Sequence, residues 1–154
     1  MCIRDSYSPE EFIEKLREFF TVEPQFEPVK PQSKFNIGMY LDKKWYLLTP
    51  KEELLQGLEK TKDTLDVSIW NDYVLKVLGI DDPRTDKRIK YIDGEKGVEK
   101  VASKVGINAF AVGFTFLPVA LSDLMKIADA GDVMPPKSTW FTPRMRNGMV
   151  VHQF

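Results

Sequence analysis

The stretch FNIGMYLDKKWYLL, residues 35–48, decides how the chain folds. Apolar residues alternate with small or polar ones up to Leu41, and a run of four apolar residues follows the polar triplet 42–44. Alternation with a period of two is typical of a strand, and a short polar break between two such runs is typical of a hairpin. The stretch therefore predicts two antiparallel strands joined by a tight turn.

Apolar residues at helical spacing follow this hairpin toward the C-terminus. They predict helices over residues 65–78, 98–105 and about 119–130. A glycine follows each of these patterns, as it does after many helices. Residues 51–60 predict a short helix or a loop.

Strand-like segments lie between these helices and after them. A short strand is predicted at residues 89–92, and residues 110–116 alternate between large and small side chains. In the tail, residues 138–141 and 149–154 predict a second hairpin. Hairpins at both ends predict an α+β fold, with a mixed, mainly antiparallel sheet and three or four packed helices.

The N-terminal side predicts a helix over residues 9–20, because Ser8 can cap the amide of Glu11 and Pro9 loses no donor at the first position. We interpret residues 7–21 as the last helix of a missing N-terminal part. Residues 22–34 contain three prolines and are interpreted as a Pro-rich connector, which leaves residues 35–154 as a C-terminal α+β domain. We expect the apolar face of the helix to be exposed or loosely docked; it consists of Phe12, Ile13, Leu16, Phe19 and Phe20.

The first six residues, MCIRDS, are interpreted as an artefact. Their codons match a transposon end used in sequencing-library preparation, and scars of this kind are excluded from fold reasoning. On this interpretation Cys2, the single cysteine, is not native, and the reading frame began inside a longer gene.

Composition excludes several classes of protein. The 154 residues carry 22 basic and 23 acidic side chains, without the basic excess of a general nucleic-acid or anionic-membrane binder. One cysteine and one histidine cannot supply a Cys/His zinc site, and no metal site is predicted. No apolar run approaches ~20 residues, the length of a membrane span. We expect a cytoplasmic protein that binds neither nucleic acid nor membrane.

The tail contains the most distinctive group of polar residues. Lys137, Ser138 and Thr139 offer one cation and two hydroxyls after two prolines, which suits a phosphate or a carboxylate. The alternative is a tight turn into an edge strand with solvated charges. In the charge-rich segment 79–88, Arg84 could hold an anion or carboxylates could hold a cation; the alternative is a solvated loop with local ion pairs.

Other conspicuous residues have structural interpretations. His152 is interpreted as a structural histidine because no second histidine or cysteine accompanies it within the single-histidine chain. Asp66 and Ser68 are interpreted as caps of the helix that begins near them. The tryptophans are interpreted as core anchors; they are Trp45, Trp70 and Trp140.

Four stretches together resemble the C-terminal half of the bacterial and archaeal family catalogued as domain of unknown function 1015. The resemblance covers nearly all of residues 35–154. Two local departures are Trp70-Asn71, where the family often has Leu-His, and Val119, where it often has Thr or Ser, so that a helix cap is expected to be missing. The four stretches are GMYLDKKWYLLT, LDVSIWNDYVLKVLGIDDPRTDKRIKYI, LMKIADAGDVMPPKSTWF and TPRMRNGMVVH.

The resemblance implies a function located partly outside this chain. The family's N-terminal half carries an Asp-Gly-His-His-Arg motif like that of the ParB and sulfiredoxin superfamily, which includes nucleotide-using phosphotransferases, some acting on free serine. No such motif occurs here. The chain is thus expected to be a fragment of a cytoplasmic phosphotransferase for a small, serine-like substrate, with no catalytic residue of its own.

The same resemblance implies the ligands and partners. It implies no cofactor in this fragment and a phosphoryl donor, ATP or pyrophosphate, with magnesium in the full-length parent. The expected partner is the missing N-terminal half, or a second copy of the chain. The alternative function is a non-catalytic interface module. Residues that match the family pattern in position are Lys137, Ser138, Thr139, Arg84 and Asp66.

Overall fold

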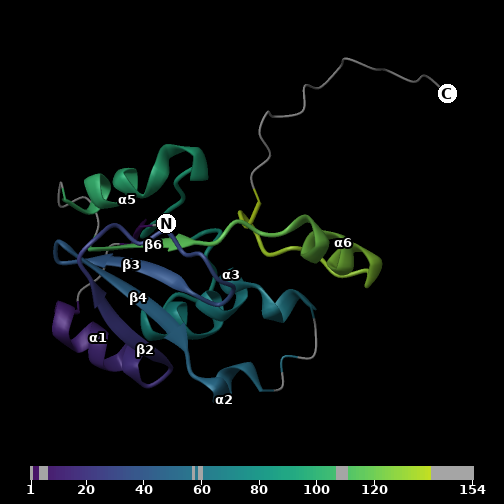
Figure 1. Ribbon diagram of the computed structural model, residues 1–154, viewed down its shortest axis with the longest axis horizontal. Coiled ribbons are helices and arrows are strands. Elements are labelled where there is room, and N and C mark those ends of the chain that lie inside the picture. The colour runs from purple at the N-terminus through teal and green to yellow at the C-terminus, as the bar shows by residue number, and fades with distance from the viewer. Residues whose placement is uncertain (1, 4–6, 57, 59–60, 107–110, 140–154) are drawn as a thin grey trace.

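The computed structural model describes residues 2–3, 7–56, 58, 61–106 and 111–139. One antiparallel sheet has the strand order β2-β4-β3-β6-β1-β5 (Figure 1). Helices cover both faces of this sheet, which confirms the α+β fold. The strands are β1 (Cys2–Ile3), β2 (Phe20–Gln25), β3 (Ile37–Leu41), β4 (Lys44–Pro50), β5 (Ile89–Lys90) and β6 (Val112–Phe116).

The helices form two layers and one projecting arm. In Figure 1, α1 and α3 lie below the sheet, α5 lies above it and α6 extends to the right. The longer helices are α1 (Pro9–Arg17), α5 (Gly97–Gly106) and α6 (Leu121–Asp129). The shorter ones are α2 (Glu52–Leu55), η1 (Thr61–Thr64), α3 (Asp66–Ile69), η2 (Trp70–Val74), α4 (Leu75–Val77) and η3 (Gly94–Lys96).

The predicted hairpin is confirmed as β3 and β4. Their turn contains Asp42 at φ 46° and Lys43 at φ 61°. Two consecutive residues with positive φ are typical of the type I′ turn, whose twist matches that of the flanking strands. The turn thus fixes the register in which Ile37 faces Leu48.

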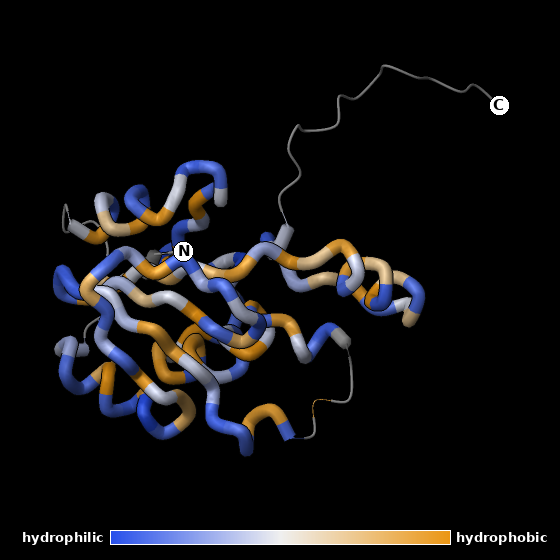
Figure 2. The backbone as a smooth tube through the Cα atoms, in the orientation of Figure 1, coloured by the Kyte–Doolittle hydropathy of each residue, from blue (hydrophilic) through white to orange (hydrophobic). Residues whose placement is uncertain are grey.

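Each face of the sheet covers its own apolar cluster. Below the sheet, Trp70 stands edge-on to Phe114 at 5.4 Å and to Phe116 at 5.8 Å between ring centroids. Above the sheet, Trp45 packs with Val101 of α5. Figure 2 shows the corresponding apolar stretches in the strands and in the helices that pack on them. Trp45 and Trp70 are therefore core anchors, as predicted.

The prediction that α1 is exposed or loosely docked is wrong. Phe12, Leu16 and Phe20 are at most 3% exposed, and Ile13 and Phe19 pack against the same cluster. The amphipathic stripe of α1 covers the lower face of the sheet, so the helix belongs to the main core. The capping box predicted at its start is present, with Ser8 accepting from the amide of Glu11.

The prediction that residues 22–34 form a connector is also wrong at its start. The strand β2 continues to Gln25 and pairs with β4 along its whole length. Pro24 is tolerated because β2 is an edge strand, where one side of the backbone needs no partner strand. Further along, Val29 is buried against the upper face.

Helix ends follow the glycine signals, but the helix predicted over residues 65–78 is not regular. It divides into α3, the π-helical turn η2 and α4, and ends at Gly79 with φ 60°. Gly131, with φ 67°, follows α6 as predicted. Ala120 precedes α6, and no side chain caps this helix. A missing cap is expected from Val119, which stands where Thr or Ser is common in the resembling family.

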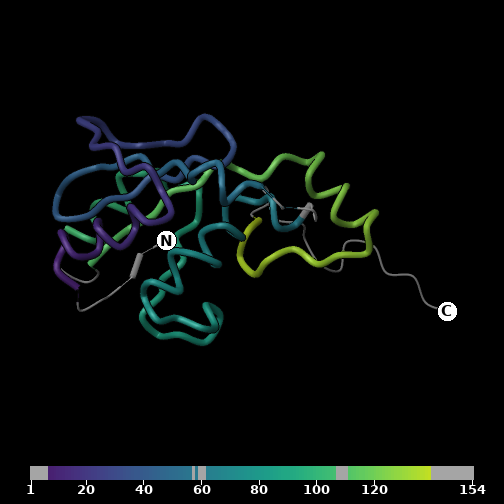
Figure 3. Tube along the Cα trace, turned by 90° about the horizontal axis from the view of Figure 1, so that it is seen from below, coloured from purple at the N-terminus to yellow at the C-terminus, as the bar shows by residue number. Residues whose placement is uncertain are grey.

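The arm α6 is attached to the body through one buried side chain and through ion pairs. Ile127 is buried, and two ion pairs flank it, Lys34 with Asp123 at 3.5 Å and Lys62 with Asp132 at 2.8 Å. The arm and the segment after it expose apolar side chains, and the chain turns back toward the body (Figure 3). These exposed side chains are Leu121, Met125 and Val133.

Two predictions concern the chain ends. Ser138 and Thr139 lie in no strand, and the remainder of the predicted C-terminal hairpin lies outside the described residues. At the other end, Cys2–Ile3 pairs with β6 and β5. Pairing through backbone groups accepts almost any extended sequence, so the origin of these residues stays a prediction.

Gly38 tests the packing on the upper face. A Cβ built there would clash with Thr115 Oγ1 and would lie 2.8 Å from the Val29 carbonyl oxygen. Gly38→Ala should therefore lower the free energy of unfolding by about 1–3 kcal/mol in urea titrations, as expected of overpacking. Gly94→Ala is the matched control, because no atom lies within 4 Å of its added Cβ. Equal stability of the two variants would contradict the close approach.

Candidate functional site

A hollow of about 490 Å³ lies where η2 and α4 meet the loop that follows Gly79. Pro136, in the segment after α6, lines one side of this hollow. Its lining residues are Asn71, Asp72, Leu75, Lys76, Ile80, Asp81, Asp82, Pro83, Arg84 and Pro136. Polar side chains from the helix and the loop thus face one space with an apolar floor.

The π-helical turn η2 supplies one wall of this hollow. The wider turn places Trp70, Val74 and Leu75 in the core while Asn71 and Asp72 reach the hollow. Single π-turns within α-helices occur frequently at functional sites. The indole Nε1 of Trp70 is buried without a hydrogen-bond partner among the described residues, which is a cost of this packing.

The opposite wall is a loop that its own side chains hold in place. Arg88 Nη2 donates to Asp86 Oδ2 at 2.8 Å, and the same guanidinium donates to the carbonyl oxygens of Leu78 and Gly79. Tyr91 donates to the carbonyl oxygen of Pro83 at 3.1 Å. These bonds fasten both ends of the loop, so the hollow exists before any ligand arrives. The predicted alternative of local ion pairs is confirmed here.

Arg84 lines the hollow, but its guanidinium is already engaged. Its Nε and Nη2 atoms donate to the two carboxylate oxygens of Asp82 at 3.0 and 3.2 Å. These hydrogen bonds hold the pKa of Asp82 below its ordinary value. The Arg84 side chain remains 69% exposed, so it can meet a ligand while keeping this partner.

The hollow carries charges of both signs. Three carboxylates, from Asp72, Asp81 and Asp82, face two cations, from Lys76 and Arg84. Partial burial raises the pKa of Asp72; Lys76 opposes this shift and Asp63 reinforces it. A perturbed carboxylate in a hollow is a candidate functional group. The mixed charge suits a ligand that itself carries both signs better than it suits a simple anion.

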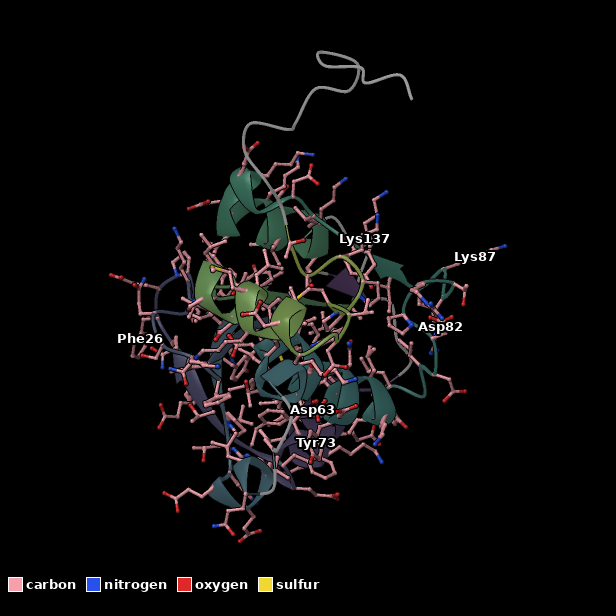
Figure 4. All side chains as sticks on the ribbon, turned by 90° about the vertical axis from the view of Figure 1, so that its right-hand side faces the viewer. Phe26, Asp63, Tyr73, Asp82, Lys87 and Lys137 are labelled. Carbon is pink, nitrogen blue, oxygen red and sulfur yellow. The ribbon has the colours of Figure 1, made fainter. Side chains whose placement is uncertain are left out.

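The predicted tail residues lie beside the hollow rather than in it. Lys137 follows Pro136, is exposed and has φ 60°. Figure 4 shows Lys137 and Asp82 on the same side of the molecule, away from Phe26. The Ser138 hydroxyl donates to the Pro135 carbonyl oxygen at 2.6 Å, so it closes a local turn, and Thr139 is exposed. The structure thus brings Arg84 and the start of the tail together.

Asp66 lies outside the hollow, and its predicted role as a helix cap is wrong. Its carboxylate accepts the backbone N–H of Phe35 at 2.7 Å, and Phe35 has the unfavourable φ of 71°. Ser68 donates to the Lys62 carbonyl oxygen instead of capping α3. Burial raises the pKa of Asp66, opposed by the Phe35 amide and by Lys34. The buried Asp66 carboxylate therefore stabilises the strained turn at Phe35. We call this hydrogen bond between Asp66 and Phe35 the clasp.

Other features of the described residues bear on the kind of site. Within the described ranges, no three or more His, Cys, Asp or Glu side chains are grouped so that they could hold a metal ion. None of the helices in those ranges combines the length and apolar character needed to cross a bilayer. His152 and Trp140 lie outside the described residues.

A family model matches the N-terminal part of the chain. The family model described as Protein of unknown function (DUF1015) matches residues 2–68. This match supports the resemblance to that family. Comparisons with curated proteins and with solved structures find no match.

The range of the DUF1015 match differs from the range of the resemblance seen in the sequence. The match covers α1, β2 and the hairpin, and ends within α3. The hollow, with residues between Asn71 and Pro136, lies beyond it. The assignment of residues to the hollow is therefore supported by the geometry of this chain and not by the family match.

Asp66 provides a test of the clasp through its pH dependence. Because its pKa is raised in the folded state, Asp66 favours folding below the ordinary value of 3.8, and this contribution is lost as the pH rises through the raised pKa. Asp66→Asn keeps an acceptor for Phe35 without the charge. It should be at least as stable as the wild type at pH 7, with the difference vanishing at acid pH.

Asp66→Ala is the comparison for this variant, because it leaves the Phe35 amide without its acceptor. It should lose about 1–3 kcal/mol in the free energy of unfolding by urea titration. If Asp66→Asn lost as much as Asp66→Ala at pH 7, the charge itself would be stabilising and the clasp as described would be wrong.

Proposed function

We propose that this DUF1015 chain is the substrate-binding part of a cytoplasmic small-molecule phosphotransferase. The hollow between η2 and the 80–84 loop would hold an amino-acid-like substrate or its phosphorylated product. One observation carries this proposal: a pre-formed space of about 490 Å³ presents carboxylates and cations to the same ligand.

The charges give the ligand an orientation. A substrate ammonium group would lie against Asp72 or Asp81, and a carboxylate or phosphate would lie against Arg84 and Lys76. Lys137, beside Pro136, would add a cation at the rim. Phosphoryl transfer depends mainly on the positioning of the reactants and on stabilisation of charge. Charged side chains such as these can do both.

The chemical step would use groups that this chain lacks. The Asp-Gly-His-His-Arg motif of the family's N-terminal half is absent from the sequence, whose single histidine is His152. We assign ATP or pyrophosphate with magnesium to that other half. The chain would then bind and orient the substrate, and its partner half would supply the phosphoryl donor.

A second candidate function is a non-catalytic interface module. It is favoured by α6, which exposes Leu121 at 67% and Met125 at 58% on an arm that leaves the body. An apolar stripe of this kind on a projecting helix is typical of a docking element. Binding to the hollow separates the two functions, because an interface module needs no small ligand.

The first test of the hollow is calorimetric titration of the whole chain with O-phosphoserine and with inorganic phosphate. Phosphoserine should bind more tightly, since it offers the ammonium group that the carboxylates need. Arg84→Ala and Lys137→Ala should each weaken phosphoserine binding by about tenfold, the scale of a charge-assisted hydrogen bond. Unfolding should be unaffected, because both side chains are exposed.

Lys87→Ala is the matched control for these two variants. Lys87 is an exposed cation in the same loop and does not line the hollow. It should bind phosphoserine like the wild type. Equal losses in all three variants would indicate a general charge effect, and absence of binding to the wild type would favour the interface module.

A second test addresses catalysis. The purified chain should show no turnover of serine with ATP or with pyrophosphate in the presence of magnesium, because the histidine-containing motif is missing. Product formation can be followed by phosphorus NMR. Turnover that Arg84→Ala abolishes would place the chemistry in this chain and contradict the division of labour proposed here.

A further inference from the structure

The charged side chains of the hollow differ in how far they are already paired. Asp82 is engaged through both carboxylate oxygens, which accept from the backbone N–H, Nε and Nη2 of Arg84 at 3.0, 3.0 and 3.2 Å. By contrast, no hydrogen bond or ion pair within the described part of the chain holds Asp72, Asp81 or Lys76, and all three are exposed. The hollow thus offers two carboxylates and one ammonium group to a ligand.

The two free carboxylates belong to opposite walls of the hollow. Asp72 lies in the π-helical turn η2, and Asp81 lies in the loop that follows Gly79. Both walls border the apolar floor, to which Leu75 and Ile80 contribute buried side chains. A ligand with one ammonium group can meet one wall. A ligand with two cationic groups joined by methylene groups can meet both walls and cover the floor with its apolar middle.

Lys76 adds a positive charge to the helical wall, close to Asp72. It follows Asp72 by four residues, a spacing that makes two helical side chains neighbours. Burial raises the pKa of Asp72 and Lys76 opposes this shift, so each group senses the other. The α-carbon of an amino acid carries an ammonium and a carboxylate group side by side, and these could meet Asp72 and Lys76 together. Arg84 is less available to the carboxylate, because Asp82 already holds its guanidinium.

We propose that the hollow selects basic α-amino acids, whose α-ammonium group meets Asp72 and whose side-chain cation meets Asp81. The carboxylate meets Lys76, which fixes the orientation of the ligand. This inference rests on the proposed function and narrows the amino-acid-like substrate of that site to a class with a second cation. Serine and phosphoserine leave Asp81 without a partner, so they fill the hollow less completely.

The test titrates the whole chain by calorimetry with three matched ligands. They are L-ornithine, L-norvaline, which lacks the side-chain ammonium group, and putrescine, which lacks the carboxylate. Ornithine should bind about tenfold more tightly than either of the others, which is the scale of one hydrogen bond between charged groups. If norvaline bound as tightly as ornithine, Asp81 would take no cation and the proposal would be wrong.

Two variants assign the two ends of the ligand. Asp81→Asn should lower the affinity for ornithine to that for norvaline and leave norvaline binding unchanged, whereas Asp72→Asn should weaken the binding of both. Asp129→Asn is the matched control, because Asp129 is an exposed carboxylate of α6 that does not line the hollow. Urea titration should show equal stability for the three variants, since exposed side chains are replaced by isosteres. If Asp129→Asn lost as much ornithine affinity as Asp81→Asn, net charge would account for the binding and the proposal would fail.

Phosphoserine separates failure of this proposal from failure of the proposed function. Binding of phosphoserine, together with equal affinities for ornithine and norvaline, would overturn the selectivity for basic amino acids and leave the substrate-binding role in place. Absence of binding by ornithine, serine and phosphoserine alike would overturn both.

Discussion

The burial of Trp70 against Phe114 and Phe116 is the contact on which the other parts of the structure depend. It joins the helical layer to the central part of the sheet, and its indole ring is fully buried. To place Trp70, Val74 and Leu75 against the sheet together, the helix widens into a π-turn. The same widening carries Asn71 and Asp72 to the hollow. The same helical distortion therefore shapes both the core packing and the candidate site.

Parts of the fold that local chemistry determines could be predicted from the sequence. The hairpin, the capping box at Ser8 and the helix ends at Gly79 and Gly131 are of this kind. The burial of α1 could not be predicted in this way, because an amphipathic stripe shows that a helix needs cover without showing what covers it. The π-turn gives no such signal, because the apolar spacing of residues 65–78 is also that of a regular amphipathic helix.

The candidate site was only partly visible in the sequence. Arg84 was found because it lies in a charge-rich loop, and the structure places it in the wall of the hollow. Asp72 and Lys76 were missed, because polar residues on one side of an amphipathic helix ordinarily face water. For Ser138 the sequence leaves an anion site and a tight turn open, and in the structure its hydroxyl donates to a carbonyl oxygen three residues earlier and so serves a turn. Such local competition between side chain and backbone is difficult to see without coordinates.

The attachment of α6 links the hollow to the ionic strength of the solution. The arm is held partly by the ion pairs Lys34–Asp123 and Lys62–Asp132, whose side chains are in part open to solvent. Salt weakens such pairs, and the chain that leaves α6 supplies Pro136 to the wall of the hollow. Loosening of the arm would thus remove one wall of the hollow while the sheet and its core stay folded. A ligand that needs this wall would in turn hold the arm in place, so binding and docking of α6 are thermodynamically linked.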